Sequence, residues 1–171
     1  MRKLNKIQLK QREAIANSLR ETYSELQKNS EAFNKLLANI SELKDISNKT
    51  INLENQNSLI TQDNIQLQQK YYDERSSELL ENISALQDTF NDAIYSSNYF
   101  TQEISELQQD YYDERSEQWQ ESEAAENYQE WIDEWSSIEL EEIGLDLSGT
   151  EIELTEGEDY ADQLNELPIN P

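Results

Sequence analysis

The chain has 171 residues, of which 35% are hydrophobic, and its formal net charge at pH 7 is -24. That length allows one ordinary domain, but the low apolar content favours paired helices or a small bundle over a thick globular core. The sequence contains neither cysteine nor histidine, which excludes disulfides, thiol nucleophiles, histidine-based triads and the commonest transition-metal ligands. We therefore expect no enzymatic activity, no catalytic residue, no metal site and no cofactor.

Glycine and proline are confined to the end of the chain. The first 143 residues contain neither, and all three glycines and both prolines fall in the last 28. Because these residues most often interrupt regular structure, their absence predicts long helices and disfavours an active site built from loops. Residues 1–20 are partly basic but contain no continuous apolar run, so they indicate neither a secretory signal nor a membrane span. A cytoplasmic location is expected.

Charge changes sign along the chain. Residues 1–50 carry ten Lys or Arg against six Asp or Glu, residues 51–115 carry three against thirteen, and eighteen acidic residues with no basic one follow Arg115. A solvated acidic surface is one interpretation of this run, and attraction of a basic protein is the other. Glu117 to Glu142 hold ten carboxylates, about one per 4 Å of helix axis, close to the roughly 3.4 Å per phosphate of one nucleic-acid strand. Direct binding of nucleic acid is expected only weakly, from the basic residues 1–20.

Apolar residues recur every three or four positions, which predicts helices over residues 3–46, 58–95 and 99–142. The apolar seam of the first helix is Leu19, Tyr23, Leu26, Phe33, Leu37, Ile40, Leu43 and Ile46, and that of the second is Ile65, Tyr72, Leu79, Ile83, Leu86, Phe90 and Ala93. The third is expected to be either continuous or interrupted near 121–127. Breaks are predicted in the Asn-rich stretch 47–58 and at 96–98, where short polar side chains compete for backbone hydrogen bonds. Short connections would fold neighbouring helices back antiparallel, and a single rod of about 210 Å is the alternative.

These elements predict an all-α fold: long helices in a coiled coil, antiparallel helical hairpins or a small bundle, with a short C-terminal β-hairpin and tail. We expect a basic helix with an Asn-rich break (1–57), a first repeat helix (58–98) and a second repeat helix with an acidic Trp-rich arm (99–143). A hairpin with an acidic docking tail (144–171) would complete the chain.

An internal repeat lies 40 residues apart in the second and third predicted helices. Residues 61–76 and 101–116 match at eleven of sixteen positions, including Tyr-Tyr-Asp-Glu-Arg-Ser, which indicates a duplicated helical unit. In each copy the first tyrosine and the arginine are four residues apart and would stack, and Arg115 also reaches Trp119 at that spacing. The repeat patch is either a helix-helix contact or a docking patch presented twice. Its residues are Tyr71, Tyr72, Arg75, Tyr111, Tyr112 and Arg115.

Residues 112–122, continuing to 128–134, read Tyr-Asp-Glu-Arg-Ser-Glu-Gln-Trp-Gln-Glu-Ser and then Tyr-Gln-Glu-Trp-Ile-Asp-Glu. Over residues 111–134 the chain resembles a motif of small, uncharacterised helical proteins of bacteria and their phages. The resemblance implies no activity. It implies a phage or mobile-element origin, a setting in which acidic inhibitors are frequent.

All three tryptophans lie in the acidic segment, and Tyr128, Trp131 and Trp135 share one helical stripe. The stripe is either core or the aromatic part of a surface for Arg and Lys side chains of a partner. The predicted partner-binding residues are Trp119, Glu121, Glu123, Glu126, Tyr128, Glu130, Trp131, Asp133, Glu134, Trp135, Asp146, Glu151 and Glu153.

Beyond Gly144 the apolar period changes to two. The pattern predicts a hairpin that pairs Leu145 with Ile152 and Ile143 with Leu154, with Asp146 opposite Glu151 on its other face. Residues 158–167 place Tyr160, Leu164 and Leu167 on one helical face before Pro168. This last stretch is predicted to be either a docking helix or a frayed tail.

Two functions are consistent with these features. The first is a non-catalytic acidic protein that occupies the basic, nucleic-acid-binding surface of a partner, such as a host protein, and inhibits it. The second is a structural coiled coil that forms a homo-oligomer when the basic N-terminal half of one chain pairs with the acidic half of another. Neither involves a membrane.

Overall fold

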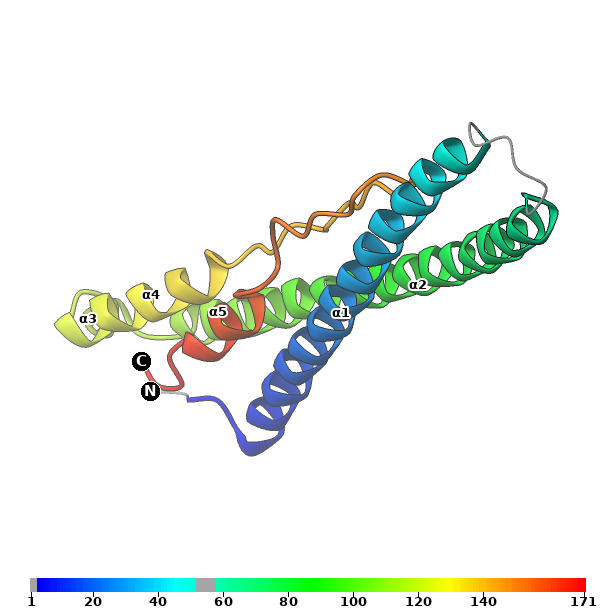
Figure 1. Ribbon diagram of the computed structural model, residues 1–171. Helices are drawn as coiled ribbons and strands as arrows, with labels where there is room; N and C mark the ends of the chain where they lie inside the picture. The colour runs from blue at the N-terminus through cyan, green and yellow to red at the C-terminus, as the bar shows by residue number, and fades with distance from the viewer. Residues whose placement is uncertain (1–2, 52–57) are drawn as a thin grey trace. The chain divides into compact units, whose positions relative to one another are not determined.

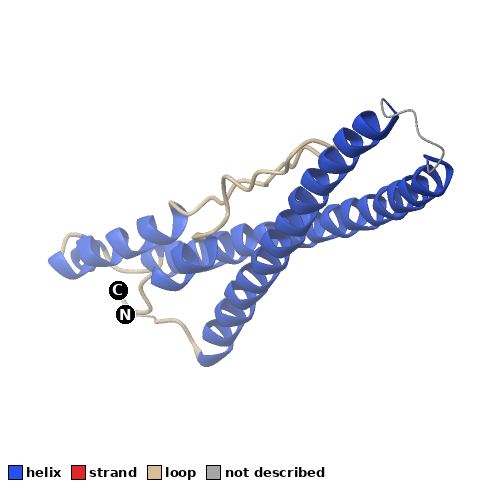
Figure 2. Cartoon of the chain, in the orientation of Figure 1, coloured by secondary structure: helices blue, strands red, loops and turns tan. Residues whose placement is uncertain are grey.

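The computed structural model describes residues 3–51 and 58–171, and this part of the chain is all-α, as predicted (Figure 1). The helices are α1 (Lys6–Ile51), α2 (Ser58–Asp113), α3 (Glu117–Gln120), α4 (Glu123–Ser136) and α5 (Tyr160–Glu166). None of the described residues belongs to a β-strand (Figure 2). No helix in the described ranges is both long enough and apolar enough to cross a bilayer.

The start of α1 is set by Asn5. Its side-chain Oδ1 accepts hydrogen bonds from the backbone N–H of Ile7 (2.8 Å) and Gln8 (3.0 Å), and its own N–H donates to Gln8 Oε1 (2.9 Å). This reciprocal arrangement satisfies N–H groups that have no partner within the helix. The helix continues past its predicted end at residue 46 to Ile51, and the rest of the Asn-rich break, residues 52–57, lies outside the described residues.

The predicted break at 96–98 is wrong, because α2 continues through it to Asp113. Ser96 Oγ donates to the backbone carbonyl of Asp92 (2.9 Å), which is compatible with a helix, and the Asn98 carboxamide bonds the main chain of Leu140. These polar side chains have partners that leave the helical ladder intact.

The predicted third helix, 99–142, is instead the second half of α2 followed by α3 and α4, which ends at Ser136. The breaks lie at 114–116 and at 121–122, and only the second is inside the expected interval. The single-rod alternative is also wrong. The rings of Tyr23 and Phe90 lie 5.8 Å apart between centroids, which a continuous helix joining them would not allow.

Contacts divide the chain into two compact units, and α1 and α2 each contribute to both. Unit 1 comprises Met1–Tyr23, Thr89–Ile143 and Glu156–Pro171, and unit 2 comprises Ser24–Asp88 and Gly144–Thr155. The larger buried apolar side chains of unit 1 are Leu19, Phe90, Ile94, Phe100, Ile104, Tyr128, Trp131, Ile132, Trp135, Tyr160 and Leu164. Those of unit 2 are Leu26, Phe33, Leu36, Leu79, Ile83 and Ile152.

The predicted apolar seam of α1 is only partly correct. Leu19, Leu26 and Phe33 are buried, but Leu36 is buried where the seam named Leu37, and Ile46 is 50% exposed.

The predicted β-hairpin is wrong, and the reason is the partner of its main chain. In unit 1, Ile143 exchanges two hydrogen bonds with the Asn91 carboxamide (3.0 and 3.1 Å), and Leu140 exchanges two with that of Asn98 (2.9 and 2.8 Å). A carboxamide offers one acceptor and one type of donor side by side, so it pairs with a residue's N–H and C=O as a neighbouring strand would.

Unit 2 uses the same device. Ile152 exchanges two hydrogen bonds with the Asn34 carboxamide (both 2.9 Å), and the Leu145 N–H donates to Gln87 Oε1 (3.3 Å). Of the four apolar residues that the period of two placed on one face, Ile143 and Ile152 are buried and Leu145 and Leu154 are half-buried. The main-chain groups of this extended segment are held by helix side chains instead of a second strand.

The C-terminal stretch is a docked helix. Tyr160, Leu164 and Leu167 are buried, as their common face predicts, and α5 is tied to α1 within unit 1. Arg12 Nη1 donates to the carbonyl of Leu167 (2.8 Å), and Arg20 forms an ion pair with Asp162 (3.0 Å).

Candidate interaction surface

Aromatic rings form a continuous series along the buried face of α4. Neighbouring centroids in the series are 5.6 to 6.2 Å apart. In order, the rings are Phe100, Trp135, Trp131, Tyr128, Trp119 and Tyr112. Such tilted and edge-on pairs add to the stabilisation that burial of the rings provides.

The stripe formed by Tyr128, Trp131 and Trp135 is core. These side chains are 0%, 3% and 0% exposed, and their polar atoms bond inside the protein. Both indole N–H groups donate to the carbonyl of Pro168, at 2.9 and 3.0 Å, and the Tyr128 hydroxyl donates to Gln108 Oε1 at 2.5 Å. In this fold these three side chains therefore offer a partner neither exposed surface nor a free polar group.

The opposite face of α4 is acidic and exposed. We call it the α4 acidic face and define it by Glu123, Glu126, Glu130, Asp133 and Glu134. These positions alternate with the buried stripe at helical spacing, so burial of the aromatic rings directs the carboxylates to solvent. Five charges along about 17 Å of axis correspond to roughly one per 4 Å. None of the five forms an ion pair with a described residue.

The other carboxylates after Arg115 are exposed too. All eighteen are at the surface, and among the residues described only Asp162 has a cationic partner. Of the predicted partner residues, Trp119 is half-buried and Glu121 is exposed beside α4, whereas Asp146, Glu151 and Glu153 belong to unit 2. Hydrogen bonds from Ser148 and then Thr150 lower the pKa of Asp146, so this carboxylate stays charged into more acidic solution.

The two copies of the repeat patch have different surroundings. In the second copy the Arg115 guanidinium lies 3.7 Å from the centre of the Tyr111 ring, which confirms the predicted stacking. Trp119 does not extend that stack within one helix, because α2 ends at Asp113, and it packs on Tyr112 instead (5.6 Å between centroids). In the first copy Tyr71 is 62% exposed.

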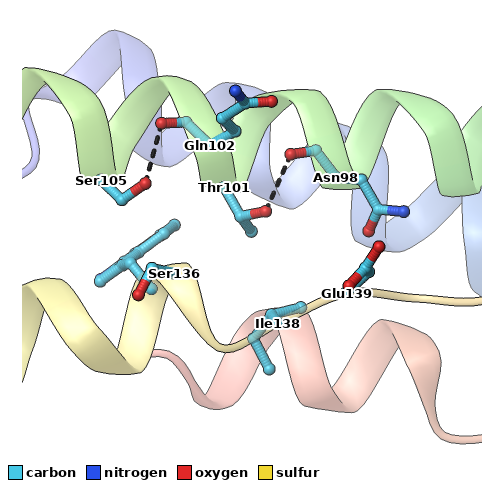
Figure 3. A pocket seen from close by; sticks show the side chains of 8 residues that line it. Asn98, Thr101, Gln102, Ser105, Ser136, Ile138 and Glu139 are labelled. Carbon is cyan, nitrogen blue, oxygen red and sulfur yellow. Dashed lines mark hydrogen bonds between the residues drawn. The ribbon is translucent and has the colours of Figure 1, made fainter.

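A pocket of about 270 Å³ lies in unit 1 between α2 and the end of α4 (Figure 3). The Thr101 hydroxyl donates to the carbonyl of Asn98 (3.0 Å), and that of Ser105 donates to the carbonyl of Gln102 (2.9 Å). Glu139 is the one ionisable residue of the lining. The pocket thus holds no acid-base pair. In residues 3–51 and 58–171 no three Asp or Glu side chains are grouped as metal ligands.

No family model, no curated protein and no solved structure matches this chain. The function of the α4 acidic face must therefore be inferred from the charge, exposure and spacing of its residues. The carboxamide contacts are the feature that sequence reasoning missed. The sequence does contain a pattern that could have indicated them. Gln87, Asn91 and Asn98 follow one another at spacings of four and seven on α2, alongside its buried residues.

Proposed function

We propose that the protein is a non-catalytic binding protein whose α4 acidic face engages a basic surface of a partner protein and inhibits it. The observation that carries the proposal is a row of five exposed carboxylates that form no ion pair with any described residue, mounted on a helix whose other face is aromatic core. Such a row is preorganised, since α4 need not fold when a partner arrives.

The spacing of the charges indicates the class of partner. About one negative charge per 4 Å of a rigid helix is close to the roughly 3.4 Å per phosphate of a nucleic-acid strand. Lys and Arg side chains arranged to contact phosphates would therefore find carboxylates at a similar spacing. A nucleic-acid-binding protein is the partner that this geometry fits best, and occupancy of its binding surface would inhibit it. The resemblance of residues 111–134 to bacterial and phage proteins supports a host protein as the target.

The test uses a variant that keeps the core. Deletion of residues 117–171 would remove Tyr128, Trp135 and Leu164 from unit 1 and would not separate folding from binding. Replacing the five carboxylates of the α4 acidic face by Gln or Asn leaves the buried stripe untouched. Bacterial lysate is passed over immobilised wild-type and variant protein, and retained proteins are identified by mass spectrometry. We expect the wild type to retain a basic protein that duplex DNA releases and that the variant does not retain.

A matched control removes the same charge elsewhere. Neutralising five exposed acidic residues of unit 2 changes the net charge equally and should leave retention intact. These residues are Glu42, Asp45, Asp73, Glu81 and Asp88. Equal loss of partner retention in both variants would show that net charge alone causes the binding, and would contradict a specific site on α4.

Assembly as a coiled coil is the second candidate, and the exposure of Ile7 (76%) and Ile46 (50%) on α1 favours it. Within the chain Arg20 pairs with Asp162, whereas Lys3, Lys6 and Lys10 form no ion pair with a described residue and are available to the acidic half of a second chain. Sedimentation velocity across a salt series tests this candidate. A monomer at every salt and protein concentration would contradict it.

A further inference from the structure

The duplicated unit offers the same set of side chains twice, and one set is occupied. Leu107, Gln108, Tyr111 and Arg115 in the second copy correspond to Leu67, Gln68, Tyr71 and Arg75 in the first. In the second copy α4 packs against Gln108 and Tyr111 of this set, while Arg115 is exposed: the ring of Tyr128 lies 5.5 Å from that of Tyr111. The Tyr128 hydroxyl donates to Gln108, which is only 1% exposed.

The equivalent set in the first copy is exposed. Leu67 is 66% and Tyr71 is 62% exposed, and Gln68 is also at the surface. Both copies lie on one continuous helix, but α2 ends just after the second, which allows the chain to return as α4 and cover it. The helix runs on past the first copy, so the chain cannot turn back there. We define the first-copy face as Leu67, Gln68, Tyr71 and Arg75.

We propose that the first-copy face binds an acidic amphipathic helix of a partner protein that presents a tyrosine, in the way that the second copy holds α4. The partner tyrosine would pack against the ring of Tyr71, tilted as Tyr128 is against Tyr111, and donate its hydroxyl to Gln68. The occupied copy specifies this chemistry, because the side chains that hold Tyr128 are identical in the two copies.

Charge distinguishes the two copies in the direction that the proposal requires. Within the ten residues from Leu67 to Ser76, the single difference from the second copy is Lys70 in place of Asp110. Lys70 is exposed and lies 3.8 Å from Glu74, a pairing between exposed groups that contributes little. The first copy is therefore the more basic of the two, which favours a partner whose tyrosine is flanked along its helix by carboxylates, as Tyr128 is by Glu126 and Glu130.

The experiment uses the full chain and a synthetic peptide of residues 116–137 carrying a fluorescent label. This peptide contains the segment that covers the second copy. Fluorescence anisotropy reports its binding in trans. We expect saturable binding that falls by about tenfold or more in the Tyr71→Ala protein. Tyr99→Ala, which removes another exposed tyrosine of α2 (59% exposed), should leave binding unchanged.

The proposed hydrogen bond is tested by a double-mutant cycle. Gln68→Ala in the protein and Tyr128→Phe in the peptide should each weaken binding several-fold, and their combination should weaken it no more than either alone. Lys70→Asp, which makes the two ten-residue segments identical, should weaken binding at low salt and have less effect at high salt.

Absence of peptide binding to the wild-type protein would overturn the proposal. Binding that depends on Gln108 but not on Gln68 would also overturn it, since the peptide would then be exchanging with α4 at the second copy. Circular dichroism of each variant shows whether α2 is intact. Because Gln68 and Tyr71 are exposed, we expect their substitution to leave the fold unchanged.

Discussion

At the scale of single residues, Gly157 shows how one position joins backbone conformation to packing. Its φ is +96°, and a Cβ at this position would lie 2.9 Å from two ring carbons of Phe90 and 3.4 Å from Tyr23. Phe90 also stacks on Tyr160, with 6.1 Å between centroids. The chain therefore enters α5 at a point where a side chain would be strained and would also push apart three aromatic rings of unit 1.

The three glycines form a graded test of this account. Gly157→Ala should lower the free energy of unfolding by roughly 2 kcal/mol or more, because strain and overpacking add. Gly149, with φ of +91° and no atom within 4 Å of an added Cβ, has only the backbone contribution, about 1 kcal/mol. Gly144→Ala should be close to neutral. Urea denaturation of the three variants measures the order, and equal effects would contradict the packing explanation.

Tyr23 and Tyr160, which both contact Phe90, predict that the folded state loses stability at alkaline pH. Burial, followed by the nearby Glu158 and Asp159, raises the pKa of Tyr23 above its ordinary value of 10.0. Burial and then Glu156 raise the pKa of Tyr160. Below pH 10 both tyrosines are neutral in the folded and unfolded chains, so they add no pH dependence. Above it the unfolded chain ionises first, and stability should fall until the folded pKa is reached.

Urea denaturation between pH 8 and 11 measures this loss. The double variant Tyr23→Phe and Tyr160→Phe should show a shallower fall than the wild type over the same range. An unchanged slope would assign the alkaline loss to other groups.

At the scale of elements, the extended segment after α4 depends on carboxamides presented by helices. Leu140 and Ile143 are buried, and each has both main-chain groups bonded to one asparagine of α2. The geometry resembles strand pairing, but the partner is a row of side chains on a rigid helix. This arrangement holds an extended chain on a helical scaffold without a sheet.

Substitution of these asparagines should therefore cost more than loss of an ordinary surface side chain. Asn98→Ala leaves the N–H and C=O of Leu140 without their partners, and about 1 to 3 kcal/mol of destabilisation is expected. Asn91→Ala should act similarly through Ile143. Asn127→Ala, at an exposed position of α4, should stay within about 0.5 kcal/mol. Chemical denaturation followed by circular dichroism gives the comparison.

The contacts of α4 also explain why its tryptophans cannot serve as exposed anchors. Trp131 and Trp135 both donate to the carbonyl of Pro168, so the aromatic stripe packs against the segment around Pro168. The sequence pattern alone did not show whether this stripe is core or a binding surface. Amphipathic spacing indicates that one face of α4 is apolar. It does not indicate whether that face meets this chain or another.

At the scale of the whole molecule, the dominant feature is uncompensated negative charge. The formal charge is -24, and the four ion pairs among described residues all join exposed groups. Repulsion between so many carboxylates opposes the folded state more than the expanded one, and salt screens it over distances of about 10 Å at 0.1 M.

Stability should consequently rise with ionic strength. We expect the melting temperature, followed by circular dichroism, to increase as sodium chloride is raised from low concentration to roughly 0.5 M, because the added salt screens the repulsion between carboxylates. The variant with a neutralised α4 acidic face should start from a higher melting temperature and respond less to salt. A wild-type melting temperature that is insensitive to salt would show that ion pairs already balance the repulsion.

The sequence by itself determined the features that depend on local spacing and composition. The absence of glycine and proline predicted long helices, and the three-four spacing placed Leu19, Phe33 and Phe90 on apolar seams that are buried. The face shared by Tyr160 and Leu164 indicated a docking helix as one of two alternatives, and α5 is that helix. The density of carboxylates, with no basic residue after Arg115, also required an acidic surface, since charges are not buried without partners.

Only the tertiary structure decided which partner each pattern meets. Period-two spacing predicted extended backbone on either side of residues 148–150, but the side chains of Asn91 and Asn34 took the place of a second strand. Identical sequences at Gln68 and Gln108 became an exposed and a buried site because the chain reverses after only one of them. Spacing determines the face on which a side chain lies. The burial of that face depends on contacts between segments far apart in the chain, which local patterns do not encode.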